Sequence, residues 1–380
     1  MNLIACQLVP SYEGNRIEEA VERLFLLLGP DAAPRPGMRV TIKPNLLMKR
    51  RPEDGTTTHP AVVRAVILAL RRRGVTDITI ADSPGGVYTK PILSGIYQAT
   101  GMEAVAKETG AKLNFDLSAV HCPQPDGAVC KAFDLIAPVA EADFVISLPK
   151  LKSHCMTGLS GGVKNLFGCI PGLTKPEFHW RYPKEDDFCN MLLDLCRTVK
   201  PGLTLVDAVV SMEGDGPSSG ELRQTGFLLA ADDPFALDLA LARAIGREGN
   251  SILTIRNARQ RGFCTQSAAE LAIAGDPLPV FSDFKMPRSR TVDFQSNIPK
   301  PLRGIAKPVI ARFFTPRPVI DPKICVGCGR CAESCPAHTI TVENRKAAIH
   351  RENCIKCYCC HEMCPVHAIS VKRSRILEKL

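Results

Sequence analysis

The chain has 380 residues, of which 45% are hydrophobic, and a formal net charge of +9 at pH 7. This length allows two or three domains with at least one large core, and no apolar stretch approaches the ~18 uncharged residues that a membrane span requires. The opening, MNLIACQLVPSYEGN, lacks the basic and apolar regions of a secretory signal. A cytoplasmic protein without a membrane span is therefore expected.

Strand-like and helix-like runs alternate through residues 1–278. Helices are predicted at residues 16–28, 60–73, 186–199 and 234–245, and strands at residues 38–43, 77–81, 143–148, 203–206 and 226–230. The clearest is the helix at 60–73, because Val62, Val66 and Leu70 share one helical face. The alternation predicts an α/β main domain with a layered, largely parallel sheet.

Polar side chains follow the predicted strands, at the edge where open parallel sheets bind their ligands. They are Lys43, Asn45, Asp82, Lys150, Lys152, His154, Lys164, Asn165 and Asp207. Four lysines in loops at one edge predict a cationic pocket for a small carboxylate or phosphate. Lys164 is the leading candidate, because Gly161 and Gly162 would let the backbone approach a ligand closely.

The candidate catalytic residues are Lys43, Lys164, His154 and the more distant His179, and the other polar residues are candidate ligand-binding groups. Each has a more ordinary interpretation, because surface lysines are usually solvated and strand-end aspartates often form turns. A metal at His154 or His179 is a further alternative.

Familiar nucleotide signatures are missing from the sequence. The run from Gly158 to Lys164 lacks P-loop spacing, and Asn165 follows the lysine where Ser or Thr is required. Nicotinamide and ATP are therefore not expected as ligands. Nucleic acid is not expected either, because no basic helix or aromatic-interleaved basic patch is visible.

Residues 279–319 are rich in proline and in basic residues, which predicts an extended linker. One interpretation is a solvated tether. The alternative is that its phenylalanines pin it along the main domain; these are Phe281, Phe284, Phe294, Phe313 and Phe314.

Residues 320–380 contain two copies of the pattern C-x2-C-x2-C-x3-C-P. The first copy comprises Cys325, Cys328, Cys331 and Cys335, and the second comprises Cys354, Cys357, Cys360 and Cys364. In two-cluster ferredoxins the fourth cysteine of each run binds the other cluster. Two [4Fe-4S] clusters are therefore predicted, with Cys364 completing the first set and Cys335 the second, in a small α+β domain that resembles bacterial ferredoxins.

The sequence gives less support to other roles for these cysteines. Zinc sites need only four ligands, usually in separated C-x2-C pairs, and a disulfide framework requires an oxidising compartment. Cys359 lies off the spacing. It is interpreted as a buried thiol beside the cluster, although it would replace Cys360 if the turn were altered.

Several sequence segments, distributed over essentially the whole chain, resemble one protein family. They are IKPNLL, TTTHPAVVRAVI, IADSPGG, VISLPKLKSHCMTGLSGGVKNLFGCIPG, VDAVVSMEGDGPSSGE and DPFALDLALARAIG, followed by the paired cysteine pattern. The chain resembles the uncharacterised iron-sulfur proteins of domain of unknown function family 362. The resemblance implies an iron-sulfur protein with a cytoplasmic α/β domain of undefined chemistry.

A second resemblance concerns the run from Gly161-Gly162-Val163-Lys164 through Pro171-Gly172 to His179. It is similar to the nickel-pincer lactate racemase family, and the resemblance implies a cofactor tether at Lys164 and a nickel ligand at His179. The chain departs from that family in lacking an Asp-x-Thr-Arg-Pro motif, and Lys43-Pro44-Asn45 stands at the corresponding strand end.

Two functions are consistent with these features. In the first, an iron-sulfur oxidoreductase passes electrons through the clusters, between a redox protein partner and a substrate at the lysine-rich edge. In the second, the main domain binds or modifies a small anionic ligand and the clusters are structural or sensing. The first is favoured because two adjacent clusters form a relay.

Overall fold

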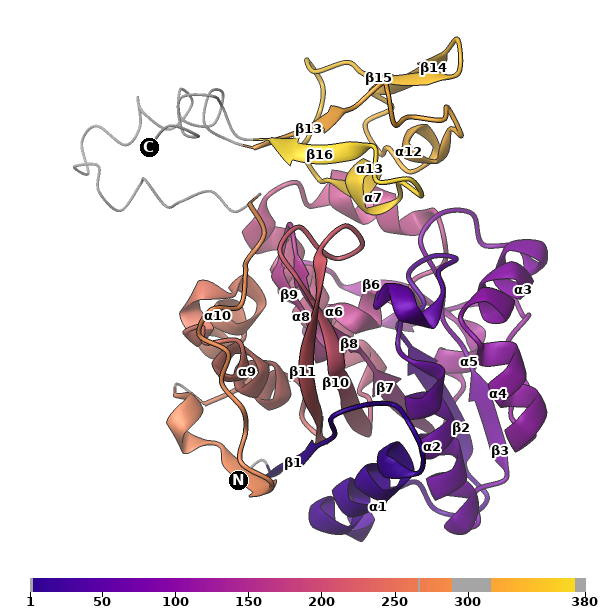
Figure 1. The fold of residues 1–380 in the computed structure, drawn as a ribbon, viewed down its shortest axis with the longest axis vertical. Coiled ribbons are helices and arrows are strands. Elements are labelled where there is room, and N and C mark those ends of the chain that lie inside the picture. Colours follow the sequence, from indigo (N-terminus) through magenta and orange to yellow (C-terminus); the bar gives the residue numbers. More distant parts are fainter. Residues whose placement is uncertain (1–2, 266, 289–315, 373–380) are drawn as a thin grey trace.

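The structure is a computed structural model, and it describes residues 3–265, 267–288 and 316–372. It contains a large α/β main domain and a small strand-rich C-terminal domain (Figure 1). Among the described residues, no helix combines the length and the apolar character needed to cross a bilayer.

The main domain is built on a ten-stranded sheet whose central path runs β12-β1-β11-β10-β7-β2-β3-β4. All neighbours along this path are parallel except the two pairs that involve β11. The strands of the path are β1 (Leu3–Leu8), β2 (Arg39–Pro44), β3 (Asp77–Ile80), β4 (Lys112–Leu113), β7 (Phe144–Leu148), β10 (Leu203–Glu213), β11 (Glu221–Ala231) and β12 (Ala272–Gly275). The largely parallel sheet predicted from the sequence is confirmed.

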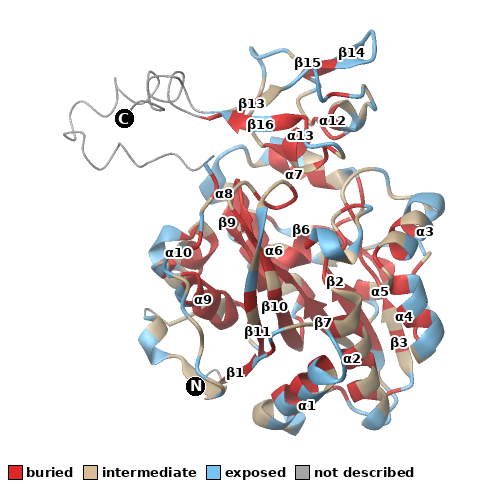
Figure 2. Ribbon diagram, viewed as in Figure 1, coloured by how far each residue is buried: buried red, intermediate tan, exposed pale blue. Residues whose placement is uncertain are grey.

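Helices cover both faces of this sheet (Figure 1). One face packs against α1 (Arg16–Leu28), α2 (Pro60–Arg72), α3 (Lys90–Ala99) and α4 (Met102–Thr109). The other packs against α6 (Gly162–Asn165), α8 (Glu185–Val199), α9 (Pro234–Ala244) and α10 (Leu253–Gln260). Strands buried on both faces need apolar residues at consecutive positions. In β10, accordingly, Leu205 faces the first core and Val206 the second, and the sheet is the most buried part of the molecule (Figure 2).

The four predicted helices are present as α1, α2, α8 and α9, and the predicted strands correspond to β2, β3, β7, β10 and β11. The prediction was wrong for the segment after β7, which was expected to be a polar loop. It forms β8 (Lys150–His154), β9 (Gly158–Ser160) and α6, because the polar side chains of β8 are buried in hydrogen bonds. Short elements absent from the predictions include α5 (Ala137–Ala140), α7 (Thr174–Arg181) and the hairpin of β5 (Ala119–Pro123) and β6 (Ala132–Ile136).

The start of the proline-rich segment lies against the main domain. Phe284 is fully buried in the core beside β11 and α9, and Phe281 packs against the same cluster. Phe294, Phe313 and Phe314 lie outside the described residues. The proposed boundaries at 278 and 319 stay a prediction, and the buried Phe284 favours a main domain that extends through residue 288.

The C-terminal domain contains two small antiparallel sheets and two one-turn helices. Its elements are β13 (Arg317–Ile320), α12 (Arg330–Glu333), β14 (Ile340–Glu343), β15 (Lys346–Ile349), α13 (Cys359–Glu362) and β16 (Ile369–Lys372). The domain sits over the carboxyl ends of the main-sheet strands, next to α7 (Figure 1).

Specific contacts hold the C-terminal domain in this position. The Arg50 guanidinium donates to the Pro365 carbonyl at 3.0 Å, and the Ser218 hydroxyl donates to the Glu362 carbonyl at 2.9 Å. Gly85 lies so close to the Met363 thioether that a Cβ at this position would be 2.5 Å from the sulfur. The absence of a side chain at Gly85 thus lets α13 approach the sheet edge.

Candidate functional site

Each of two small cavities in the C-terminal domain is lined by four cysteines. One is lined by Cys325, Cys328, Cys331 and Cys364, and the other by Cys335, Cys354, Cys357 and Cys360. Three cysteines of each cavity come from one sequence copy and the fourth from the other. The remaining lining residues are mostly apolar.

Backbone amides point at several of these sulfurs. The Ala368 amide donates to Cys364 Sγ at 3.1 Å, and the Ala347 amide donates to Cys325 Sγ at 3.4 Å. Such donors stabilise negative charge on thiolates and tune an iron-sulfur cluster. Four cysteines around an apolar cavity therefore fit a [4Fe-4S] cluster. In the described part of the chain, no group of three or more His, Cys, Asp or Glu side chains is arranged to hold a single metal ion.

Cys359 does not line either cysteine cavity. It is buried at the start of α13 and lines a third cavity, between the two domains. This arrangement agrees with the interpretation of Cys359 as a buried thiol beside the cluster.

The interdomain cavity has a volume of about 90 Å³. The main domain contributes the loops that follow β2 and β3, together with α6 and α7, and the C-terminal domain contributes Ser334, Cys359, Glu362 and Met363. Of the residues predicted from the sequence, those that line it are Lys43, Asn45, Asp82, Lys164, Asn165 and His179.

At the sheet edge, Lys43 is held by a buried ion pair. Its ammonium is 2.6 Å from an Asp82 carboxylate oxygen, and both side chains are almost completely buried. The same ammonium donates to the Asn165 side-chain oxygen at 3.3 Å, and that oxygen also accepts from the Asn45 amide at 3.1 Å. Because its charge is already compensated, Lys43 forms a fixed wall of the cavity.

Lys164 differs from Lys43 in its partners. Within the described residues its ammonium has no hydrogen bond, and it lies 4.8 Å from the centroid of the Phe167 ring. Burial lowers the pKa of Lys164, and the nearby Glu362 carboxylate opposes this effect. Lys164 is thus a half-buried cation with donors available to a ligand.

Lys175 was not among the predicted site residues, yet it lines the cavity from α7. Its ammonium donates to the Ser83 hydroxyl at 2.9 Å and to the Pro84 carbonyl at 3.2 Å, both of which are neutral acceptors. His179 lies four residues further along the same helix, so both side chains face the cavity. This i, i+4 spacing is the sequence signal that could have identified Lys175.

His179 is a buried histidine with an unsatisfied ring nitrogen. It is 4% exposed, and its Nδ1 has no hydrogen-bond partner. The ring stacks on Phe188 with centroids 4.3 Å apart. Burial and the Lys164 charge lower the pKa of His179 to about 3, so the ring is neutral at pH 7.

If the cavity binds an anion, as the lysines at the sheet edge predict, the binding should weaken as the pH rises above about 7. Burial, reinforced by the charges of Lys43 and Lys164 and opposed by Asp82 and Cys169, lowers the pKa of Lys175 to about 7. An anion favours the ammonium form, so binding above that pH requires proton uptake and should weaken about tenfold per pH unit. Titration with acetate across this range measures the slope.

Arginine supplies the control for this pH dependence. Because arginine keeps its charge throughout the range, the Lys175→Arg variant should show a flatter profile. An unchanged slope in this variant, or a flat profile in the unmodified protein, would contradict the role of Lys175.

The structure places Lys150 and Asp207 away from this cavity, in an ion pair of their own. The Lys150 ammonium donates to Asp207 at 2.9 Å and to the Tyr12 hydroxyl at 2.6 Å. The Tyr12 ring stacks on His59 with centroids 3.7 Å apart. These contacts tie β8 and β10 to the residues that precede α1 and α2.

Lys152 and His154, also on β8, lie behind the cavity wall. The Lys152 ammonium donates to the Asn45 side-chain oxygen at 2.9 Å and to the Thr56 carbonyl at 2.7 Å. His154 accepts two backbone amides at Nδ1, from Met156 and Thr157, so its proton sits on Nε2, which is 3.2 Å from Glu362. Both residues support the site from behind its lining.

Gly161 and Gly162 do not line the interdomain cavity. The prediction that they let the backbone approach a ligand there was therefore wrong. The amides of Gly162 and Val163 donate to the Asp238 carboxylate at 2.6 and 3.1 Å. A Cβ at Gly161 would be 2.1 Å from an Asp238 oxygen. The glycine pair therefore allows α6 to pack closely on α9, and Asp238 occupies the amides at the start of α6.

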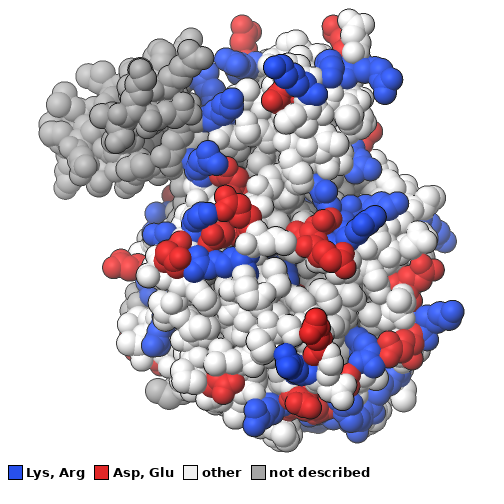
Figure 3. Space-filling view, viewed as in Figure 1, with Lys and Arg blue, Asp and Glu red and all other residues white. Residues whose placement is uncertain are grey.

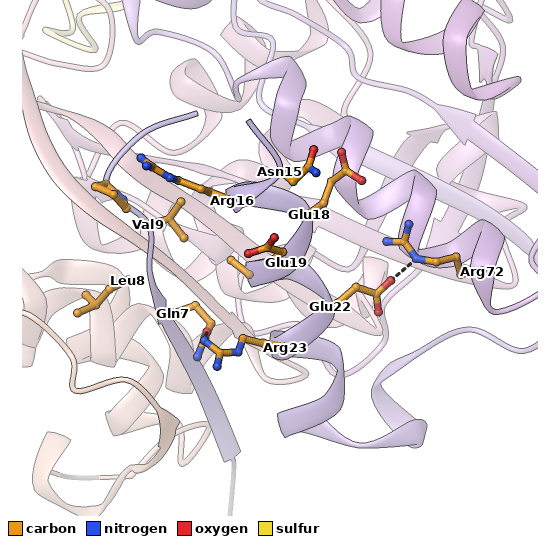
Figure 4. A pocket seen from close by; sticks show the side chains of 12 residues that line it. Gln7, Leu8, Val9, Asn15, Arg16, Glu18, Glu19, Glu22, Arg23 and Arg72 are labelled. Atoms are coloured by element: carbon orange, nitrogen blue, oxygen red, sulfur yellow. Dashed lines mark hydrogen bonds and ion pairs between the residues drawn. The ribbon is translucent and has the colours of Figure 1, made fainter. Parts of the chain in front are cut away.

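A larger hollow of about 750 Å³ is an open groove between β1 and α1 (Figure 4). It is lined by charged side chains that include Arg23, Glu22 and Arg72. Arg72 and Glu22 neutralise each other at 2.6 Å, and none of the predicted site residues lies here. The interdomain cavity is therefore the better candidate site, despite its smaller volume.

Comparisons with known proteins agree with this architecture. Residues 40–243 match the domain of unknown function DUF362, and residues 317–365 match the 4Fe-4S dicluster domain. The chain is 33% identical over 291 residues to the thylakoid-associated protein sll1697 of Synechocystis sp., covering 73% of this chain and 85% of that protein.

Two solved structures are similar to part of the chain. One is the lactate racemase apoprotein of Thermoanaerobacterium thermosaccharolyticum, with 14% identity and a TM-score of 0.37, covering 62% of this chain and 55% of that chain. The other is a Thermotoga maritima protein, with 13% identity and a TM-score of 0.33, covering 52% of this chain and 50% of that chain. The chain thus spans about half the length of these structures.

The family match covers more than half of the chain, and the match to the relative covers 73% of it. The protein belongs to the DUF362 family and carries a C-terminal 4Fe-4S dicluster domain.

Proposed function

We propose that the protein is an iron-sulfur redox protein that carries electrons between a protein partner and a small anion bound in the interdomain cavity. Cys325, Cys328, Cys331 and Cys364 would hold one [4Fe-4S] cluster, and Cys335, Cys354, Cys357 and Cys360 the other. When bound, the clusters would supply one-electron transfer. The observation that carries this proposal is that the interdomain cavity lies next to the second cysteine set.

That contact is made by residues adjacent to the cluster cysteines. Ser334 precedes Cys335 and Cys359 precedes Cys360, and both Ser334 and Cys359 line the interdomain cavity. A ligand in the cavity would therefore lie beside the cluster held by the second set. The cluster held by the first set would lie farther from the cavity and would exchange electrons with the cluster held by the second set.

The main domain supplies the positive charge for an anionic substrate, and the C-terminal domain supplies part of the cavity wall. Lys164 and Lys175 line the cavity without a directly paired carboxylate, and Lys43 is neutralised by Asp82. Glu362, Cys359 and Met363 cover the cavity from the C-terminal domain. Burial of the ammonium groups strengthens their attraction for an anion, because the surroundings have a lower dielectric constant than water.

Single-turnover reoxidation tests this proposal. The clusters are reduced anaerobically, the reductant is removed, and small 2-oxo and 2,3-unsaturated carboxylates, which each accept two electrons and two protons, are added while the visible absorption is followed. Inorganic phosphate, which accepts no electrons, is the control. Recovery of the oxidised spectrum in the unmodified protein, and at least tenfold slower recovery in Lys164→Met with unchanged iron content, supports electron transfer at this cavity. If none of the added anions reoxidises the clusters, or if the variant reacts equally fast, the proposal fails.

The exposed edge of the first cysteine set suits an acidic electron-carrier protein. Cys328 is exposed, and the neighbouring side chains of Ile324 and Val326 are about half exposed. Lys323 and Arg330 flank this edge, and Lys and Arg side chains gather along the C-terminal domain (Figure 3). Apolar contact surrounded by positive charge favours fast, salt-sensitive association with a negatively charged partner.

Reversing the charge at this edge should slow reduction by an acidic ferredoxin. We expect the Lys323→Glu/Arg330→Glu variant to be reduced about tenfold more slowly than the unmodified protein at low ionic strength, with the difference shrinking as salt is added. Stopped-flow absorption measures both rates. Reduction by uncharged chemical donors should be unaffected, and Lys90→Glu/Lys107→Glu on α3 and α4, with the same change in charge, is the control for net charge. Equal rates for the two variants would exclude this edge as the docking surface.

A cytoplasmic location remains part of the proposal. No disulfide joins the described cysteines, and we propose a reducing compartment for them. The name of the Synechocystis relative records an association of that protein with thylakoids. Fractionation of cells that express the tagged protein distinguishes a soluble pool from a membrane-bound one.

A further inference from the structure

The size of the interdomain cavity limits what it can hold. The cavity has a volume of about 90 Å³ and is partly open to solvent. Pockets for drug-sized ligands are several times larger, at roughly 300–1,000 Å³. The buried part of this cavity therefore suits a small ligand or a small anionic group.

Apart from the ion pair at the sheet edge, two ammonium groups, of Lys164 and Lys175, face the single carboxylate of Glu362 in the cavity, so its charge favours an anion. The donors that point to an anion are those of the two lysines and of His179. Lys175 uses two of its three ammonium donors on neutral oxygens, and no described hydrogen bond uses those of Lys164. His179 adds a neutral imidazole whose unsatisfied Nδ1 donates to an anion in the tautomer that carries the proton on Nδ1. These three side chains can surround one anionic group.

Several backbone amides near the cavity are already occupied. The Ser83 amide donates to the Gly168 carbonyl, the Gly85 amide to the Leu47 carbonyl, and the Gly172 amide to the Ser83 hydroxyl. The first amides of α6 bind Asp238. Phosphate sites commonly use backbone amides at a helix start or in a glycine-rich loop. The donors that remain suit a carboxylate better than a phosphate.

We propose that the ligand of the interdomain cavity is a small monocarboxylate, bound through its carboxylate group by Lys164, Lys175 and His179. This inference rests on the proposed function for the role of the cavity and adds the chemical class of the ligand. It assigns Lys175 and His179, both from α7, as specificity-determining residues. Phe167 and the residues of α13 line the cavity beside these groups, so short carboxylates are expected to fit better than long ones.

Calorimetric titration of the oxidised, cluster-loaded full-length protein with formate, acetate, propionate and hexanoate tests this inference without any electron transfer. The short carboxylates should bind, whereas hexanoate and inorganic phosphate should bind at least tenfold more weakly. Loss of a charge-assisted hydrogen bond in Lys164→Met or Lys175→Met should weaken acetate binding about tenfold to a hundredfold. Lys107→Met on α4 is the matched control and should bind acetate normally.

Each result of the titration either supports or overturns the inference. Iron content and circular dichroism confirm that each variant is folded, and His179→Phe, which keeps the aromatic stacking, provides a second route if a lysine variant is unstable. Equal binding of phosphate and acetate, or no binding of any short carboxylate, overturns the inference even if another molecule reoxidises the clusters. Selective acetate binding without cluster reoxidation keeps the ligand assignment and removes the electron-transfer proposal.

Discussion

Replacing Cys335 with serine is expected to halve the iron content of the anaerobically purified protein, from about eight atoms per chain to about four. Cys335 belongs to the first sequence copy, but it lines the cavity of Cys354, Cys357 and Cys360. The cluster that is lost should therefore be the one held mainly by the second copy. Iron and acid-labile sulfide analysis measures the loss, and electron paramagnetic resonance of the reduced protein identifies the cluster that remains.

Two further variants control for general damage to the domain. Cys364→Ser should remove the other cluster, because Cys364 lines the cavity of the first copy. Cys359→Ser should leave about eight iron atoms, since Cys359 faces the interdomain cavity. If Cys359→Ser loses half of the iron, Cys359 is a ligand in place of Cys360. If the unmodified protein holds only about four iron atoms, or zinc, the two-cluster proposal is wrong.

Replacing Lys150 with methionine is expected to destabilise the main domain by about 3–5 kcal/mol, because it leaves the Asp207 carboxylate buried without its cation. Both side chains are at most 1% exposed, and their ion pair is 2.9 Å long. Acetate binding should not change, because Lys150 does not line the interdomain cavity. Urea unfolding followed by circular dichroism measures the stability, and calorimetry measures the binding.

Two comparisons separate this ion pair from a general effect of losing a lysine. The double variant Lys150→Met/Asp207→Asn removes both charges and should recover part of the loss. Lys112→Met breaks an exposed pair with Asp77 at 2.9 Å and should cost less than about 1 kcal/mol. If Lys150→Met is as stable as Lys112→Met but no longer binds acetate, Lys150 is a ligand-binding residue, as its position in the sequence first suggested.

The sequence alone determined the features that depend on local spacing. Helix α2 was predicted because its apolar residues recur with helical periodicity, and the parallel sheet was predicted because strands and helices alternate. The cysteine spacing also grouped the residues that lie around each cysteine cavity, although their role as ligands stays a prediction. These signals are readable because each arises among residues that are close together in the chain.

The tertiary structure decided which lysines meet and which carry a compensated charge. Lys43, Lys150 and Lys164 looked alike in the sequence, yet Asp82 and Asp207 neutralise the first two, whereas Lys164 keeps free donors. Strand β8 was read as a loop, because burial of its lysines depends on partners that are distant in sequence, such as Asn45. The cavity itself forms only where α13 packs over the sheet edge, which brings Glu362 to Lys164. Burial and ion pairing of this kind depend on contacts between distant parts of the chain, which no local pattern specifies.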